Sequence, residues 1–286
     1  MKTLFNQTSK TVALGMITVL AACSPEEETP NTIDLSVNAD DNFIAQRNSE
    51  KVNVFKGPEV QYGSGKARSW ISVNEEGFPM EIGIELTEEV FDDVSQLETE
   101  NELTSSVILP LHQKAKELTP FEHIGLNYQV AGHGPIFWSE HFDFHFYTIS
   151  NEERTAIPEY DPTNQDIVDG YNLFPDMTKM PSDYFKLPGQ LGVIPMMGKH
   201  WLPLDWQTGY DPFTHIMILG TYSQKNVFIE PMITVDYLLS GEEFSGNYSQ
   251  PQTFEEPGNN YPTKYNIYHD GKKNNIYITL SDFVKR

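Results

Sequence analysis

An alternating segment from His141 to Tyr147 constrains the fold of this chain more than any other feature of its sequence. It reads His-Phe-Asp-Phe-His-Phe-Tyr, and side chains on a β-strand point to opposite faces with a period of two residues. One face would carry the three phenylalanines as a core-facing stripe. The other would carry His141, Asp143, His145 and Tyr147, whereas exposed strands usually carry Thr, Lys, Glu and Ser. Two imidazoles flanking a carboxylate indicate a lined cavity or a coordination site.

Strand signals recur along the rest of the chain. Alternating or β-branched stretches predict strands within residues 69–73, 80–86, 124–130, 141–149, 213–222, 227–235 and 276–280. Helical signals are fewer: an N-cap pattern at Thr87, and helical spacing over residues 105–118 that Pro110 weakens. The predicted fold class is mainly β: a single antiparallel β-barrel or β-sandwich domain with a few short helices and a long proline-rich excursion.

That excursion covers residues 151–195, where six prolines argue against a long regular element. Its aromatic residues supply enough apolar surface to pack over the sheet, namely Tyr160, Tyr171, Phe174, Tyr184 and Phe185. The segment could serve as a lid on the histidine-bearing face or could simply cover it.

The first 50 residues predict export and lipid attachment. Residues 1–22 have a basic lead and an apolar run too short to span a bilayer, which is typical of a signal peptide. The run ends in Leu-Ala-Ala-Cys23, which matches the bacterial lipobox, so Cys23 is the predicted lipidation site. A general secretory signal is the alternative. Residues 23–50 are predicted to be an acidic flexible tether, and residues 51–286 a single β-rich domain.

The lipid on Cys23 would attach the protein to a membrane in the cell envelope. Ser24, standing where an aspartate would retain a lipoprotein, favours the outer membrane or cell surface if the source is diderm. Cys23 is the only cysteine, so stability must come from core burial, metal or oligomerisation, and a homo-oligomer is one expectation. The net charge of −22 and the lack of any basic patch argue against nucleic acid as a partner.

Other residues capable of chemistry lie outside the alternating strand. His200 lies in Gly-Lys-His-Trp, and Glu230 stands alone in an apolar run. Burying an unpaired carboxylate costs several kcal/mol, so Glu230 needs a metal or a histidine as partner. His133, His215 and Tyr147 are predicted to support the metal ligands rather than to bind the ion.

Strand geometry limits how these residues combine. His141 and His145 lie about 13 Å apart at Cα on a regular strand, so both cannot readily reach one ion unless the strand bulges. The predicted ligands are therefore His141 or His145, together with Asp143, His200 and Glu230. Two histidines and a carboxylate leave open positions on Zn, Fe, Mn or Cu, as catalysis or capture of a small ligand requires. Two methionines, at 196 and 197, would favour copper, although methionines more often fill gaps in a core.

Histidines on a sheet can also be structural, and a His-Asp-His ladder can be a hydrogen-bond network. His112, His123 and His269 stand in polar or loop surroundings and are expected at the surface. The sequence has neither a Gly-x-Ser-x-Gly elbow nor a phosphate-binding glycine loop. Two function classes remain: a metal-dependent enzyme or metal-binding protein, and a non-catalytic envelope module that captures a ligand or oligomerises.

Several of these motifs together resemble an uncharacterised family of bacterial exported proteins and lipoproteins. The resemblance covers most of residues 60–240 and rests on Gly-His-x-Pro, His-Phe-Asp-Phe-His-Phe-Tyr, Gly-Lys-His-Trp and Glu-Pro-Met-Ile-Thr. It implies export and the pairing of the histidine segments, and it implies no reaction. Gly134 follows His133 where the family has a proline, so the resemblance assigns no role to His133.

Overall fold

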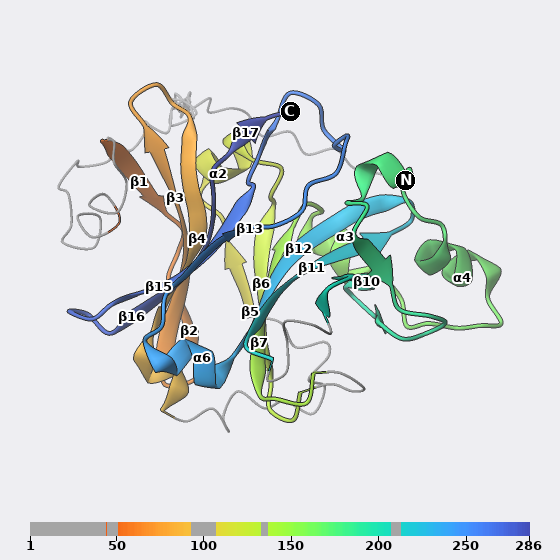
Figure 1. Cartoon of the computed structure of the whole chain (residues 1–286), viewed down its shortest axis with the longest axis horizontal. Helices are drawn as coiled ribbons and strands as arrows, with labels where there is room; N and C mark the ends of the chain where they lie inside the picture. Colours follow the sequence, from red (N-terminus) through yellow and green to blue (C-terminus); the bar gives the residue numbers. More distant parts are fainter. Residues whose placement is uncertain (1–43, 45–50, 93–106, 133–136, 207–212) are drawn as a thin grey trace, which may run out of the picture. The chain divides into compact units, whose positions relative to one another are not determined.

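Two antiparallel sheets make up most of the described structure (Figure 1). The computed structural model describes residue 44 and residues 51–92, 107–132, 137–206 and 213–286. Across the first sheet the strands are β1 (Val52–Lys56), β3 (Gly65–Asn74), β4 (Pro79–Thr87), β16 (Asn275–Ser281), β15 (Lys264–Asp270) and β13 (Phe244–Asn247), with β2 (Val60–Tyr62) paired to β3.

The second sheet carries the histidine-rich strand. Its strands are, in order, β5 (Val107–Pro110), β6 (His123–Gln129), β7 (His141–Tyr147), β12 (Lys225–Thr234), β11 (His215–Tyr222), β10 (Gly198–Pro203) and β8 (Tyr184–Lys186), with β9 (Val193–Ile194) paired to β10. A separate pair joins β14 (Asn260–Tyr261) and β17 (Val284–Lys285). Every pairing among the described strands is antiparallel.

A shared apolar core lies between the two sheets. Ile82 and Ile278 of the first sheet belong to the same buried cluster as Leu126 and Phe144 of the second. Burying each such side chain stabilises the fold by about 1.5–3 kcal/mol. The described strands close no barrel, because each sheet ends in edge strands. These sheets lie within Val37–Arg286, which forms one compact unit, and the predicted mainly antiparallel β fold is confirmed.

All seven predicted strand segments lie in strands of the structure, within a residue or two at their ends. The helix predicted over residues 105–118 is wrong in its first half, because residues 107–110 form β5 and only α2 (Gln113–Leu118) is helical. Pro110 has no N–H to donate and disfavours helical geometry in the residue before it. Thr87 precedes η1 (Glu88–Phe91), a single 3-10 turn.

The proline-rich excursion forms short elements, as predicted. It contains α3 (Asn151–Thr155), α4 (Gln165–Asn172) and η3 (Met177–Lys179), followed by β8 and β9, which pair with β10. Tyr171 packs on Tyr222 with ring centroids 5.1 Å apart, and Phe174 packs on Trp201 at 5.2 Å. The excursion is therefore fastened to β10 and β11, next to the strand position of His200.

One residue of the predicted tether is described by the structure. Ile44, within the predicted tether, is fully buried against Trp70, Tyr268 and Tyr277. The predicted signal peptide and Cys23 lie outside the described residues. In the part of the chain that the structure describes, no helix is both long and apolar enough to cross a membrane. After β12 the chain continues into α6 (Val235–Ser240).

Candidate metal centre

The two faces of β7 separate as the alternation predicts. Phe142, Phe144 and Phe146 belong to the core between the sheets. His145 and Tyr147 lie on the other side, where the ring of Phe228 is 4.7 Å and 5.6 Å from theirs. Every residue of β7 is buried. The polar face of this strand is therefore inside the protein, and each polar group on it needs a partner.

Strand pairing brings Glu230 and His200 to His145. Ile229 of β12 lies opposite Phe146 of β7, and Met232 lies opposite Asp143, which places Glu230 opposite His145. Side chains in such positions have Cβ atoms about 4.5–5.5 Å apart. Two positions from Glu230 along β12, and so on the same face, Phe228 lies opposite Gly220 of β11, which in turn lies opposite His200 of β10.

The missing side chain at Gly220 leaves space between His200 on β10 and the group on β12 and β7. A Cβ added at Gly220 would collide with the ring of Phe228, so that ring occupies the space over the glycine. The ring of Phe228 lies 5.0 Å from that of His200 and 4.7 Å from that of His145. A β-bulge between Gly220 and Thr221 alters the pairing at the same place, as bulges often do next to functional sites.

The resulting group contains His145, His200 and Glu230, with one ligand atom from each lying within 4.8 Å of the others. Glu230 Oε2 is 3.5 Å from His145 Nε2 and 3.7 Å from His200 Nε2. These separations are too long for good hydrogen bonds. Two ligands on a tetrahedral ion with bonds of about 2.0–2.1 Å would lie roughly 3.3 Å apart. The spacing thus resembles that of ligands around an ion, and the group could hold one.

His145 and Glu230 carry polar atoms without a hydrogen-bond partner among the described residues, whereas His200 Nδ1 donates to the Gly192 carbonyl at 3.0 Å. Both ring nitrogens of His145 and the Oε2 atom of Glu230 have no hydrogen-bond partner among the described residues. Both side chains are at least 98% buried. Leaving such atoms unsatisfied costs about 1–3 kcal/mol each, and more for a charged group. A cation between them would remove that cost.

Burial shifts the protonation of both groups. It lowers the pKa of His145 to about 3, and burial together with the nearby Asp143 raises the pKa of Glu230 well above its usual value. The imidazole is therefore neutral, which is the form that binds metals, whereas the carboxyl holds a proton that it must release when an ion binds.

His141 and Asp143 form a buried pair beside this group, and Asp143 is also hydrogen-bonded to Glu230. His141 Nε2 lies 3.3 Å from Asp143 Oδ1, and His141 Nδ1 donates to the Ser139 carbonyl at 2.6 Å. Gln129 donates to the other oxygen of Asp143 at 3.2 Å. Burial lowers the pKa of His141, but the charge of Asp143 and its hydrogen bond raise it further, so the net shift is upward. Of the two histidines on β7, His145 is the one that meets His200 and Glu230.

Tyr147 and His123 extend the site along the sheet. Tyr147 stacks on His145 at 5.3 Å and on His123 at 4.8 Å. The expectation that His123 is a surface residue is wrong, because it lies opposite Tyr147 in the β6–β7 pair and is only 4% exposed. Arg154 of α3, which the sequence did not single out, is also buried, with its guanidinium 5.7 Å from the Tyr147 ring.

The remaining histidines lie elsewhere. His215, predicted to support the ligands, is three residues before Ile218, which pairs with Glu230, and an odd spacing puts it on the opposite face of the sheet. There its Nδ1 lies 2.9 Å from the hydroxyl of Tyr265. His112 caps α2 and is half-buried, as is His269, which donates to the Leu238 carbonyl. His133 lies outside the described residues.

Comparisons of this chain with protein-family models, with curated proteins and with solved structures found no match. Together, fold and site define a mainly antiparallel β-protein in which a buried group of two histidines and one glutamate could hold a metal ion.

Proposed function

We propose that this chain is an exported, lipid-anchored protein that binds one transition metal ion through His145, His200 and Glu230 and uses it in catalysis. The observation that supports the metal site is the convergence of three ligand atoms within 4.8 Å, two of them from side chains at least 98% buried. Such a convergence of unsatisfied groups costs free energy unless something binds there.

Two nitrogens and one carboxylate suit Zn, Fe, Mn or Cu and leave at least one position for water or a substrate. An ion held there would act as a Lewis acid, polarising a bound group or lowering the pKa of bound water. His200 is the most exposed of the three ligands, with 13% of its side chain accessible. A small ligand would therefore approach from the His200 side, under the residues of the excursion. Met197 lies in an apolar cluster, where it fills space, and so gives no preference for copper.

The cellular part of the proposal comes from the sequence. The signal pattern of residues 1–22 and the lipobox ending at Cys23 support attachment to a membrane of the cell envelope, the outer membrane if the source is diderm. The motifs shared with the uncharacterised exported family agree with this location. The two packed sheets support a β-sandwich as the architecture of the anchored domain.

A second candidate is a non-catalytic envelope module with structural histidines, which captures a ligand or forms a homo-oligomer. The observation that favours it is the pairing of His141 with Asp143, in which His141 Nδ1 donates to the Ser139 carbonyl and Asp143 Oδ2 accepts from Gln129. Under this reading the histidine-rich strand would be a buried hydrogen-bond network.

Elemental analysis separates the two candidates. The chain from residue 24, purified without a His tag, should contain about one transition metal ion per molecule, and a chelator should lower its melting temperature. His145→Ala and Glu230→Gln should each lose the metal. His112→Asn, which keeps an N-cap residue on α2, is the matched control and should retain it. Absence of metal, with melting unchanged by the chelator, would support the second candidate.

A further inference from the structure

A pocket of about 520 Å³ lies near the metal group without including any of its three ligands. It is lined by Leu219 and Ile229, whose sequence neighbours Ile218 and Glu230 pair across β11 and β12 on the metal side. Phe228, whose ring packs against His145 on the metal side, lines the pocket as well. Its volume is in the range of small-molecule sites.

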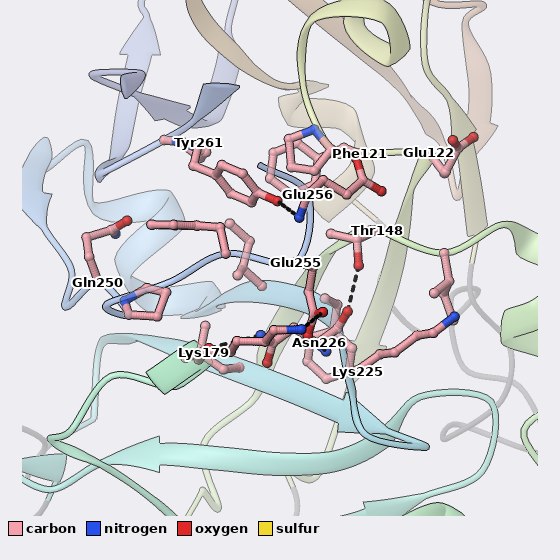
Figure 2. Close-up of a pocket in the computed structure, with 18 of the residues that line it drawn as sticks. Phe121, Glu122, Thr148, Lys179, Lys225, Asn226, Gln250, Glu255, Glu256 and Tyr261 are labelled. Atoms are coloured by element: carbon pink, nitrogen blue, oxygen red, sulfur yellow. Dashed lines mark hydrogen bonds and ion pairs between the residues drawn. The ribbon is translucent and has the colours of Figure 1, made fainter. Parts of the chain in front are cut away.

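One side of the pocket is aromatic. Figure 2 shows Phe121 and Tyr261 on that side, and Phe254 packs against Tyr261 with ring centroids 4.4 Å apart. The guanidinium of Arg286 lies 5.3 Å from the Phe254 ring, which helps to hold that ring in place. Four prolines add further apolar surface, namely Pro120, Pro181, Pro251 and Pro262.

The opposite side is polar and fixed by its own hydrogen bonds (Figure 2). Lys179 Nζ donates to Glu255 Oε2 at 2.6 Å, and the Asn226 backbone N–H donates to Glu255 Oε1 at 3.2 Å. The Asn226 side chain donates to the Lys179 carbonyl at 3.0 Å, and Thr148 donates to the Asn226 carbonyl at 2.9 Å. These bonds fasten the segment around Glu255 to β12, so the pocket is formed before any ligand arrives.

Hydrogen-bonding capacity remains for a ligand. Among the described residues the Lys225 side chain has no hydrogen bond or ion pair, although its charge attracts Glu153, and the Gln250 side chain donates through its amide nitrogen to the Tyr248 carbonyl. Glu256 accepts from Asn259 through one oxygen. A ligand could therefore meet an ammonium donor, an amide oxygen and a carboxylate oxygen at the edge of the pocket.

Charge narrows the ligand class. The lining contains four carboxylates and two lysines, namely Glu122, Glu153, Glu255, Glu256, Lys179 and Lys225. In a chain of net charge −22, this excess of carboxylates disfavours phosphates, nucleotides and anionic headgroups. The polar side also disfavours an acyl chain, because apolar carbon would cover groups that could otherwise bind hydroxyls.

We propose that this pocket binds a short neutral oligosaccharide. A sugar ring has an apolar C–H face and a rim of hydroxyls that both donate and accept hydrogen bonds. The aromatic side of the pocket matches the first, and the amide, carboxylate and ammonium groups match the second. The site is a saccharide-binding site separate from the metal group.

Calorimetric titration of the mature chain with neutral tetrasaccharides tests this. The panel contains cellotetraose, maltotetraose, laminaritetraose, xylotetraose and chitotetraose. At least one should bind saturably, and Phe254→Ala should weaken its affinity about tenfold through loss of ring stacking. Gln250→Ala should weaken it several-fold. Trp138→Ala, which removes an exposed aromatic residue outside the pocket, is the control and should bind as the wild type does.

Four results would overturn the proposal. The first is the absence of saturable binding for the whole panel. The second is a Phe254→Ala variant that binds as tightly as the wild type. The third is a proline-rich peptide or a fatty acid that competes successfully for the pocket. The fourth is loss of saccharide binding after chelation, since none of the proposed metal ligands lines the pocket. Saccharide binding by a metal-free preparation would support this inference even if the metal proposal failed.

Discussion

Gly220 shows how one residue without a side chain can determine a site made by others. The Phe228 ring occupies the space where its Cβ would lie, and that ring packs against both His145 and His200. An isolated glycine inside a β-branched strand often marks a close approach of this kind. This signal was present in the sequence, but the group that approaches Gly220 comes from a neighbouring strand.

Gly220→Ala should therefore displace Phe228 and loosen the metal group. We expect a loss of about 1–3 kcal/mol in the free energy of unfolding, typical of overpacking, together with a lower metal content. Urea denaturation and elemental analysis would measure the two effects. Gly271→Ala is the matched control, because a Cβ there meets nothing within 4 Å. A Gly220→Ala protein as stable and as metal-rich as the wild type would contradict this account.

His123 should stay neutral in mildly acidic solution. Burial, together with the charges of Arg154 and Lys116, lowers its pKa to about 4. Because the pKa is lowered in the folded protein, the stability gained by burying neutral His123 is complete above about pH 6.5. It is lost as the pH falls toward 4, because the unfolded chain takes up the proton first. NMR of the imidazole signals between pH 7 and 4 would follow it. Protonation of His123 near pH 6.5 in the folded protein would disprove this.

Among the elements, α3 has the clearest local sequence code. Ser150 accepts from the Glu153 backbone N–H at 3.1 Å while the Glu153 side chain accepts from the Ser150 N–H at 2.9 Å, which is a capping box. The helix is only five residues long, so its stability depends on this cap and on packing. It carries Arg154, which lies over Tyr147 beside the metal group.

Ser150→Ala should remove the cap and cost about 1 kcal/mol of stability. Ser182→Ala provides the control, because Ser182 is exposed and its loss should have little effect. Thermal unfolding of the two variants gives the comparison, and hydrogen exchange at residues 151–155 would show whether the helix itself opens. Equal stability of the two variants would mean that packing of Arg154, rather than the cap, holds α3.

Period-two alternation predicted the strands well, whereas helical spacing over residues 105–118 predicted the wrong element before Pro110. The strand from His141 to Tyr147 could be predicted because each of its faces has one chemical character. Residues 107–110 could not be assigned correctly from helical spacing, because they pair with β6 and that pairing is not visible in the local sequence. Tertiary contacts override weak helix propensity in this way.

The whole molecule carries a large negative charge, and this sets how it should respond to salt. A net charge of −22 on 286 residues repels itself in the compact state. At 0.1 M ionic strength, interactions between exposed charges more than about 10 Å apart are largely screened. Repulsion between carboxylates across the surface should therefore weaken as salt is added.

The melting temperature of the metal-free protein should rise between low salt and about 0.2 M NaCl, a range over which the Debye length falls to below 10 Å. Differential scanning calorimetry at constant pH would record it. Replacing NaCl with KCl should give the same rise, which shows screening rather than binding of one cation. A melting temperature that falls with salt would mean that attractive ion pairs such as Lys179 with Glu255 outweigh the general repulsion.

The sequence by itself determined the strand-rich fold class, the two faces of the histidine-rich strand and the isolation of Glu230, because each depends on residue types at short spacing. Only the tertiary structure decided that His145, rather than His141, meets His200 and Glu230, and that His215 faces away. The reason is physical: β7, β12, β11 and β10 are far apart in sequence. Their register, including a bulge at Gly220, is set by long-range pairing, and a shift of one residue would send each side chain to the other face.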